Sequence, residues 1–319
     1  MRRNNKAYLV SYLVLFAILA AFVSFIMARK EQLYKLSHIS LSYIITITFL
    51  TFLYLIINAF SAKKLTDAFG VRLTFKEWFG LSCLTSIGNY ILPAKAGVTA
   101  RAFYMKNKYD FPYLSFLSAY MGFYFFSFLV NAVFGIALIC LRYFLAGIFN
   151  FKILLFFISV GIFIGGFMIS WKWFAGKSFK VAAVNKIFSG LNYFRKQKSL
   201  LLILSGLNLL SMLVLSGRLF FAYQAIGIRP DFIAILIMAN IVSLFVFVSI
   251  TPANLGFKEA AITITSAVMG FTAINGALAS IVDRAISILV VLFLGIIFTF
   301  VFFNEFKAQA GSKIRDENA

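Results

Sequence analysis

The chain has 319 residues, of which 62% are hydrophobic and only 13% are charged. Because a soluble domain carries about 25% charged residues, this composition excludes an ordinary water-soluble fold. The net charge of +20 does not imply that the protein binds nucleic acid. Lys and Arg accumulate in the cytoplasmic loops of membrane proteins, where they face anionic lipid. Cys83 and Cys140 form no CxxC pair, so we expect no metal site, no structural disulfide and no cofactor.

The hydropathy of the chain predicts an all-α, polytopic membrane protein. Several windows hold 20 or more uncharged residues, enough to cross a hydrocarbon core of ~30 Å. The first window, 7–28, is longer than the signal-peptide core of about 7–15 residues, so we expect a spanning helix there. About six full spans are predicted, near 7–28, 40–61, 112–141, 152–171, 200–224 and 275–303.

These spans are expected to form one membrane domain, 1–303, followed by a polar cytoplasmic tail, 304–319. Two halves, about 40–171 and 200–303, are joined by the segment 172–198, which carries seven cations and no acid. Apolar residues recur in that segment at near-helical spacing. This pattern predicts an amphipathic helix on the cytoplasmic surface of the membrane.

The distribution of Lys and Arg predicts the orientation of the chain. If the N-terminus is cytoplasmic, 21 of the 30 cations lie in cytoplasmic segments and only 6 lie in outer loops. Cations accumulate on the cytoplasmic side of membrane proteins, so we expect both termini to be cytoplasmic.

Two further apolar regions, 75–110 and 231–272, are each broken near the middle by a proline. The break at "LPAKAGVTARA" (92–102) resembles the break at "TPANLGFKEAA" (251–261), since both contain Pro-Ala-x-x-Gly. Upstream of the first break, "GVRLTF" resembles the "GIRPDF" found upstream of the second. Two ordered matches at nearly equal spacing indicate an internal duplication.

The predicted orientation gives these regions opposite directions of entry. The first enters from the cytoplasm and the second from outside, so the halves are predicted to be inverted repeats. Each broken region is then a re-entrant helical hairpin with Pro93 or Pro252 at its tip. In transporters of this kind, paired interrupted segments meet near the midplane and form the substrate site. A simple helix kink at each proline is the alternative.

The first break has the composition of an anion site. Pro93 ends one half-helix, because proline lacks an amide hydrogen and clashes with the preceding turn. Gly97 lets the backbone turn, and a new half-helix begins around Val98 with its positive end facing inward. Lys95 and Arg101 lie beside that end, and Arg101 is predicted to grip a phosphate most strongly. Alternatively, both cations extend to the cytoplasmic headgroups.

The second break is chemically different. Thr251 and Asn254 are candidate helix caps. Lys258 and Glu259 follow them, and we expect these two charges to neutralise one another.

Three further charges, Arg218, Asp283 and Arg284, lie inside apolar helices. Charges at such positions are expensive and normally face a polar interior, so they are functional candidates. The alternative is that they form structural ion pairs.

These motifs resemble those of the flippase-like membrane region found in lysylphosphatidylglycerol synthases and in many stand-alone bacterial membrane proteins. The first-half pattern of that family is matched by Asn89, Pro93, Gly97, Arg101 and Ala102. The second-half pattern is matched by Thr251, Pro252, Leu255, Gly256, Lys258, Glu259 and Ala260, and a later arginine by Arg284. The candidate substrate-binding residues are therefore Asn89, Pro93, Lys95, Gly97, Arg101, Arg218, Thr251, Pro252, Asn254, Gly256, Lys258, Glu259, Asp283 and Arg284. No catalytic or metal-binding residue is predicted.

The resemblance implies a lipid translocase of the bacterial cytoplasmic membrane. It would move an anionic phospholipid or a polyprenyl-phosphate-linked lipid between leaflets, with membrane lipids and proteins of envelope synthesis as partners and no nucleic acid. The segment "AYMGFYFFSFLVNAVFG" departs from the family, which often carries a Glu-Arg pair and an Asp there, so any role of those residues is absent or moved. The chain ends at Ala319, so we expect the aminoacyl-transferase activity of full-length synthases to be missing.

Two other functions fit parts of the pattern. A membrane transferase of lipid-linked glycan or envelope synthesis would need a positioned carboxylate or histidine. Only Glu259 and Asp283 are predicted to lie deep in the membrane, which makes catalysis the weaker interpretation. The third possible function is that of an accessory subunit of an envelope-synthesis complex. This function does not explain why charged residues lie inside apolar helices.

Overall fold

The computed structural model describes residues 39–91, 95–174, 196–245, 251 and 254–317, together with a few single positions. All regular structure within these residues is α-helical. The predicted first span, 7–28, and most of the predicted amphipathic segment, 172–198, lie outside the described residues, and so do Pro93 and Pro252.

Five of the described helices are long and apolar enough to cross a membrane. They are α2 (Leu41–Ala68), α5 (Tyr113–Ala146), α6 (Phe151–Phe174), α8 (Lys198–Ala225) and α11 (Ala273–Glu317). Each coincides with one of the spans predicted to begin near residues 40, 112, 152, 200 and 275. α11 continues through most of the segment predicted as a polar tail, because the Ala, Gln, Lys and Arg residues there favour a helix.

The two regions predicted to be broken each contain two shorter helices. Residues 75–110 contain α3 (Phe75–Ile91) and α4 (Ala96–Tyr109). Residues 231–272 contain α9 (Phe232–Phe245) and α10 (Phe257–Val268). In both regions the two helices pack against each other.

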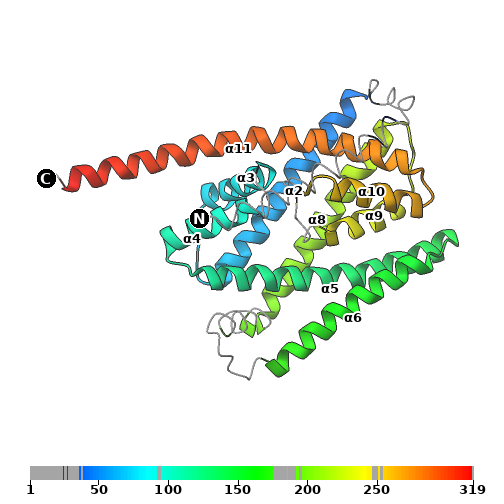
Figure 1. Cartoon of the computed structure of the whole chain (residues 1–319), viewed down its shortest axis with the longest axis horizontal. Coiled ribbons are helices and arrows are strands. Elements are labelled where there is room, and N and C mark those ends of the chain that lie inside the picture. Colours follow the sequence, from blue (N-terminus) through cyan, green and yellow to red (C-terminus); the bar gives the residue numbers. More distant parts are fainter. Residues whose placement is uncertain are drawn as a thin grey trace.

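The long helices frame the two short pairs. Figure 1 shows α2 and α8 side by side, crossing the molecule diagonally between α11 on one side and α5 on the other. α6 packs along α5. The α3–α4 pair lies toward one end of the molecule and the α9–α10 pair toward the other (Figure 1). The two pairs therefore approach the middle of the molecule from opposite ends.

The order of the helices recurs along the chain. The helices α2 to α5 begin at Leu41, Phe75, Ala96 and Tyr113, and the helices α8 to α11 begin at Lys198, Phe232, Phe257 and Ala273. Each helix of the second set thus begins 157 to 161 residues after its counterpart. In Figure 1, α2 and α8 run in opposite directions, and so do α5 and α11.

Two glycines allow close contacts that hold the short helices in place. A Cβ atom on Gly97 of α4 would lie 2.0 Å from the carbonyl oxygen of Thr85 in α3, so only glycine fits there. A Cβ on Gly276 of α11 would lie 2.6 Å from the Cβ of Ser266 in α10. Small residues at such crossings let helix backbones approach each other in a membrane, where no hydrophobic force drives helices together.

α9 is the most enclosed of the described helices. It is apolar around its whole circumference, and residues from Ala234 to Leu244 are buried with the exception of Ser243. A helix that is apolar on all sides is expected to be buried. Its one amide, Asn240, donates a hydrogen bond of 2.8 Å to the Asn131 carbonyl of α5. Asn131 in turn accepts a hydrogen bond of 2.8 Å from Asn208 of α8, so polar groups tie three helices together.

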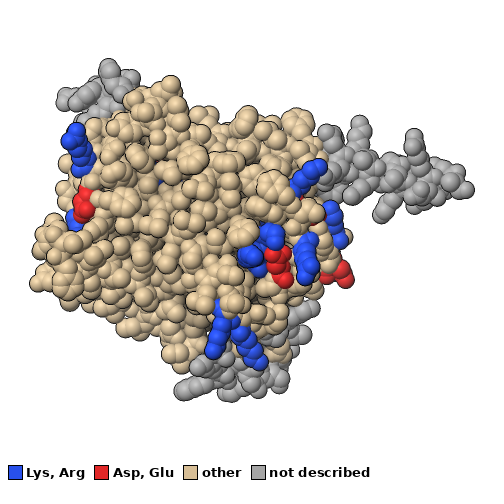
Figure 2. Space-filling model, turned by 180° about the vertical axis from the view of Figure 1, so that it is seen from behind, with Lys and Arg blue, Asp and Glu red and all other residues tan. Residues whose placement is uncertain are grey.

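The charged side chains at the surface of the described residues gather at two ends of the molecule. On the face seen in Figure 2, a broad band without charged residues separates the two groups. One end holds the C-terminal ends of α2 and α4 and the start of α3, which carry Lys63, Lys64, Arg72, Lys76, Lys106 and Lys108. The other end holds the junctions of α5 with α6 and of α8 with α9, which carry Arg142, Lys152 and Arg229. An uncharged band between charged ends is the surface that a membrane-spanning protein presents to lipid.

Candidate functional site

A cavity of about 260 Å³ lies where the two short helix pairs meet the long helices. Every described helix except α6 contributes to its lining, either directly or through the residues that join it to the next helix. We call it the central cavity. Seven of the residues predicted from the sequence line it: Asn89, Lys95, Arg218, Thr251, Asn254, Lys258 and Arg284.

The start of α4 positions the cation of the first break. Lys95 precedes α4 and has a left-handed backbone (φ 55°), so its side chain is directed differently from those of the helix that follows. Its ammonium lies 4.6 Å from the centre of the Tyr124 ring of α5, within cation–π range. Asn89 of α3 accepts a hydrogen bond of 3.0 Å from the Gly97 amide and so fixes the start of α4 against α3.

The start of α10 corrects the predicted caps of the second break. Neither Thr251 nor Asn254 caps α10, which begins at Phe257. Thr251 instead donates a hydrogen bond of 2.8 Å to the Leu255 carbonyl, and Asn254 adopts a left-handed backbone (φ 56°). The chain thus makes one more turn before the helix starts. The carboxylate of Glu259 reaches back and accepts a hydrogen bond of 2.7 Å from the Gly256 amide.

The predicted pairing of Lys258 with Glu259 is also wrong. Lys258 forms an ion pair of 2.7 Å with Asp283 of α11. Asp283 also accepts two hydrogen bonds from Arg218 of α8, at 2.7 and 3.0 Å. Adjacent residues of a helix point in different directions, so Lys258 and Glu259 find partners on different sides of α10.

Glu259 neutralises the remaining arginine of this group. Its carboxylate accepts a hydrogen bond of 2.6 Å from Nε of Arg284. The three cations Arg218, Lys258 and Arg284 are therefore matched by two carboxylates, so the buried group carries a net charge of +1.

The positive charges of this group face the cavity. Arg218, Lys258 and Arg284 all line the central cavity, and Lys95 lines it from the other helix pair. Among the described residues of the lining, none is acidic. Asp283 and Glu259 bind these cations without lining the cavity, so the wall of the cavity is positive.

Arg101 lies apart from the central cavity, although the sequence places it beside the first break. Its side chain is buried, with 3% exposed, and its Nη1 donates a hydrogen bond of 3.2 Å to Ser82 of α3. Its Nε and Nη2 have no hydrogen-bond partner among the described residues.

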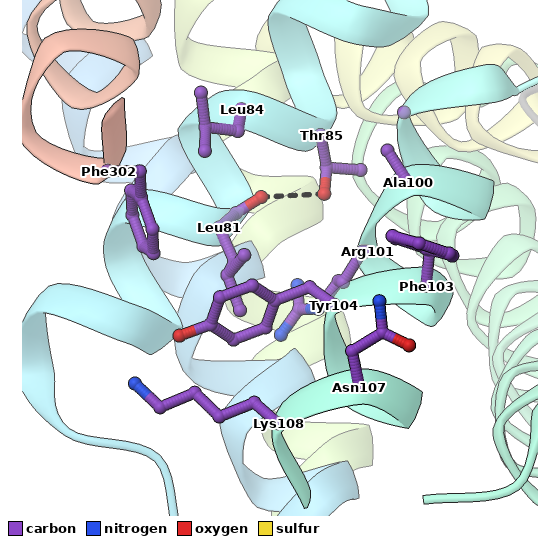
Figure 3. A pocket seen from close by; sticks show the side chains of 11 residues that line it. Leu81, Leu84, Thr85, Ala100, Arg101, Phe103, Tyr104, Asn107, Lys108 and Phe302 are labelled. Carbon is purple, nitrogen blue, oxygen red and sulfur yellow. Dashed lines mark hydrogen bonds between the residues drawn. The ribbon is translucent and has the colours of Figure 1, made fainter. Parts of the chain in front are cut away.

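Two further hollows meet at Arg101. One, of about 150 Å³, is lined by polar residues of α2, α3 and α5 as well as by α4, and we call it the side pocket. It adjoins the central cavity, because Ser86, Asn89 and Tyr124 line both. The other, of about 550 Å³, lies between α3, α4 and the Phe302 side chain of α11, and we call it the apolar groove (Figure 3).

Some residues of the site were not predicted from the sequence. The ring of Tyr54 in α2 lies 5.6 Å from the guanidinium of Arg218, and Ser287 of α11 accepts a hydrogen bond from the same arginine. The sequence signal for Tyr54 and Tyr124 was weak. Each lies in a helix with other tyrosines and several phenylalanines, and only its hydroxyl distinguishes it from a lipid-facing ring.

A second cluster that the sequence analysis missed closes the charged end of the α3–α4 pair. Glu77, in the first turn of α3, forms an ion pair of 2.8 Å with Lys108 and accepts hydrogen bonds from Tyr104 and Tyr109. Its other oxygen accepts bonds from the Thr74 amide and hydroxyl, at 2.9 and 2.8 Å. Burial alone would raise the pKa of Glu77, but these donors lower it to about 2. The spacing Thr-x-x-Glu is the sequence signal, since it marks a helix start.

The comparison with protein-family models agrees with the resemblance described above. The family model of the "Lysylphosphatidylglycerol synthase TM region" matches residues 8–295. This range includes all residues that line the central cavity and the side pocket. The comparison with curated proteins gives no significant match.

Proposed function

The chain belongs to the family of the lysylphosphatidylglycerol synthase membrane region, and on that premise we propose that it is a lipid translocase. In this proposal it moves an anionic lipid between the two leaflets of the membrane. The observation that carries the proposal is the central cavity, which is lined by the ends of both short helix pairs and by four cations. Cations in the lining stabilise the negative charge of a phosphate when it moves from water into the interior of a membrane.

The arrangement of the helices supports translocation. The helices recur in the same order in two halves, and corresponding long helices run in opposite directions. Inverted repeats with interrupted helices are the architecture of many secondary transporters, whose substrate sites lie between the repeats. We therefore assign α3–α4 and α9–α10 as re-entrant hairpins of an inverted repeat, with 172–198 as the linker between the halves.

The distribution of charge supports an orientation for this assembly. The end with Lys63, Lys64, Lys106 and Lys108 carries more cations than the end with Arg142 and Lys152. The more basic end is assigned to the cytoplasm, so the α3–α4 pair opens toward the cytoplasm and both termini lie inside. We assign this membrane, as the family resemblance implies, to the cytoplasmic membrane of a bacterium.

The electrostatics of the cavity favour an anionic substrate. Buried ions cost several kcal/mol each unless their charge is balanced, and two carboxylates balance only two of the three positive charges of Arg218, Lys258 and Arg284. The remaining positive charge is stabilised when a phosphate occupies the cavity. An empty cavity would then be the less stable state, and this gives the substrate a favourable place near the middle of the membrane.

The transferase alternative receives less support from the geometry. Glu259 and Asp283, the acids predicted to lie deep in the membrane, are both engaged by cations. A general base must be free to accept a proton from a substrate. In this site both carboxylates instead hold the cations that face the cavity.

Leaflet exchange in vesicles tests the proposal. The purified chain is reconstituted into liposomes that contain a fluorescently labelled phosphatidylglycerol or phosphatidylcholine, and a membrane-impermeant quencher is added outside. We expect the quenched fraction of phosphatidylglycerol to exceed the outer-leaflet share, and the quenched fraction of phosphatidylcholine to stay close to that of protein-free vesicles. Exchange no faster than in protein-free vesicles for phosphatidylglycerol would contradict the proposal.

A further inference from the structure

The inner end of the α9–α10 pair is tied to α11 by two ion pairs. Lys258 and Glu259, in the first turn of α10, bind Asp283 and Arg284 of α11 respectively. Both carboxylates are buried. Separating a buried ion pair leaves its charges uncompensated in a medium of low dielectric constant, so these contacts hold the end of the pair in one position.

The outer end of the α9–α10 pair is tied to α5 and to the residues that join α5 with α6. Asp231, directly before α9, accepts a hydrogen bond of 3.1 Å from Nε of Arg142 in α5. Nη1 of the same arginine donates a bond of 3.3 Å to Sδ of Met269, directly after α10. Asn150 donates a bond of 3.4 Å to the carbonyl of Val268, the last residue of α10. The start of α9 and the end of α10 are therefore both anchored.

The inner end of the α3–α4 pair has uncharged residues at the corresponding positions. Val98 is the third residue of α4, as Glu259 is of α10, and Tyr124 is the twelfth residue of α5, as Arg284 is of α11. The ammonium of Lys95 lies 4.6 Å from the centre of the Tyr124 ring. A cation–π contact places no second buried charge opposite the cation, so moving this end away from α5 leaves no carboxylate unpaired.

Strong bonds instead connect α3 and α4 to each other. At the outer end of the pair, Glu77 of α3 binds Lys108 and two tyrosines of α4. At the inner end, Asn89 of α3 accepts the hydrogen bond of the Gly97 amide, and the two backbones touch at this glycine. The pair is thus fastened at both of its ends and moves as one rigid unit.

Aromatic rings form contacts of this unit with α11. The ring of Phe79 in α3 lies 5.4 Å from that of Phe298, and the ring of Tyr104 in α4 lies 5.7 Å from that of Phe302. Phe302 is the thirtieth residue of α11, as Arg142 is of α5, so a ring contact stands where the other half has an ion pair. Apolar contacts are non-directional, so such surfaces can shift against one another without breaking a specific bond.

Hollows on several sides give the α3–α4 pair room to move. Both of its helices line the central cavity, the side pocket and the apolar groove, whereas α9 and α10 contribute only Val242 and Lys258 to these three hollows. No residue of α3 between positions 84 and 90 is fully buried, but every residue of α9 between positions 234 and 242 is. Segments with few buried contacts are the ones displaced most easily.

Arg101 makes the observed position of the α3–α4 pair costly. Its side chain is 3% exposed, and its Nε and Nη2 have no hydrogen-bond partner among the described residues. An unsatisfied buried donor raises the free energy of the state in which it occurs. Positions of α4 in which this guanidinium reaches water or a ligand therefore compete with the observed one.

We propose that the α3–α4 pair is the moving wall of the central cavity. It shifts as one unit against α2, α5 and α11, while the α9–α10 pair stays fixed to α5 and α11. The inference rests on the proposed function, because it assigns the movement that opens the central cavity during translocation. The two halves share an order of helices, but the charges of the second half make its short pair the static one.

Two disulfides to α11 test which pair moves, in a chain whose native cysteines are replaced by serine. Ile87→Cys with Gly295→Cys links α3 to α11, since a Cβ on Gly295 would lie 2.8 Å from the Cβ of Ile87. Ser266→Cys with Gly276→Cys is the matched control, which links α10 to α11 across a corresponding distance of 2.6 Å. Both pairs need only a small separation to reach the Cβ–Cβ distance of a disulfide, about 3.5–4.5 Å.

Leaflet exchange of labelled phosphatidylglycerol is measured for each chain in its reduced and oxidised forms, and maleimide labelling counts the thiols that remain. We expect oxidation of the 87–295 pair to slow exchange at least about tenfold, because a gating movement is blocked, and reduction to restore it. Oxidation of the 266–276 pair should change the rate by less than about twofold. Undiminished exchange by the oxidised 87–295 chain, or equal slowing of both chains, would overturn the proposal.

Distances between spin labels test the movement without lipid exchange. Labels at Phe103→Cys of α4 and at Ile264→Cys of α10 are each measured against a label at Leu202→Cys of α8, and all three positions are exposed. In liposomes we expect two maxima for the distance from α4 and one narrow maximum for the distance from α10. One narrow maximum for α4, or two for α10, would contradict the assignment.

The two measurements separate this inference from the proposed function. Two positions of the α3–α4 pair in a chain that exchanges no lipid would contradict the proposed function alone. Lipid exchange by a chain in which the α3–α4 pair has a single position would contradict this inference alone.

Discussion

Asp283 is the residue on which the buried charges depend, because it is the counter-ion of both Arg218 and Lys258. Replacing it by asparagine leaves two buried cations without a counter-charge. Breaking a buried ion pair from one side typically costs about 3–5 kcal/mol. We therefore expect Asp283→Asn to lower the midpoint of thermal unfolding in detergent by several degrees.

The matched control for this variant is Asp67→Asn. Asp67 forms an ion pair with Lys63 on the same helix, partly exposed to solvent, and such pairs contribute only about 0.3–0.5 kcal/mol. Equal unfolding midpoints for the two variants would show that Asp283 does not stabilise the buried cations.

The lowered pKa of Glu77 predicts how the free energy of unfolding depends on pH. Its folded-state pKa of about 2 lies below the ordinary value of 4.5, so its stabilising effect is complete above pH 4.5 and is lost as the pH falls toward 2. We expect Glu77→Gln to destabilise the protein at pH 7 by about 2 kcal/mol, allowing for screening by water. The difference between wild type and variant should shrink between pH 4.5 and 2. A difference that does not change with pH would contradict the role of the Glu77 carboxylate.

The sequence identified most of the charged residues of the site, but not their partners. Arg218, Asp283 and Arg284 were found because a charge within an apolar helix is costly and therefore conspicuous. Their pairing depends on how α8, α10 and α11 rotate against one another, which no local pattern encodes. Lys258 and Glu259 are adjacent in sequence and were expected to pair, yet each binds a residue 25 positions away on α11.

At the scale of the helix pairs, Gly97 is the residue that sets the crossing of α3 and α4. Replacing it by alanine places a Cβ 2.0 Å from the backbone oxygen of Thr85. The two helices can relieve this steric clash only by moving apart. We expect Gly97→Ala to destabilise the chain by about 1–3 kcal/mol and to reduce phosphatidylglycerol binding, since the crossing shapes both the groove and the side pocket.

Gly165→Ala on α6 is the control for this change, because no atom lies within 4 Å of the added Cβ. It should be neutral or slightly stabilising, as alanine favours a helix more than glycine does. If the two alanine variants unfold at the same temperature, the close approach of α3 and α4 does not constrain the fold.

The sequence also predicted the positions of the two helix breaks. It predicted less accurately the residues at which the following helices begin. Proline and glycine mark the two breaks, and each region contains two helices. The start of α10 could not be predicted, because Thr251 and Asn254 are good caps by composition but the backbone makes an additional turn before Phe257. Cap chemistry is local, while the position of the turn depends on contacts with other helices.

At the scale of the whole molecule, the proposed orientation predicts which ends are accessible from outside the cell. Single cysteines are introduced into a chain in which Cys83 and Cys140 are replaced by serine. Ile148→Cys, between α5 and α6, should react with an impermeant thiol reagent in intact cells. Asp110→Cys, between α4 and α5, should react only after the membrane is opened. The reverse pattern would invert the orientation.

The measurement that tests the account most directly is leaflet exchange of labelled phosphatidylglycerol by Arg101 variants in matched liposomes. A lysine keeps the charge of Arg101 but cannot grip a phosphate with two parallel hydrogen bonds, and an alanine keeps neither. We predict that Lys106→Gln exchanges lipid like wild type, that Arg101→Lys is clearly slower, and that Arg101→Ala is inactive, with equal amounts of protein in each vesicle preparation. Equal exchange by wild type, Arg101→Lys and Arg101→Ala would contradict the sequence-based prediction that Arg101 grips the lipid phosphate.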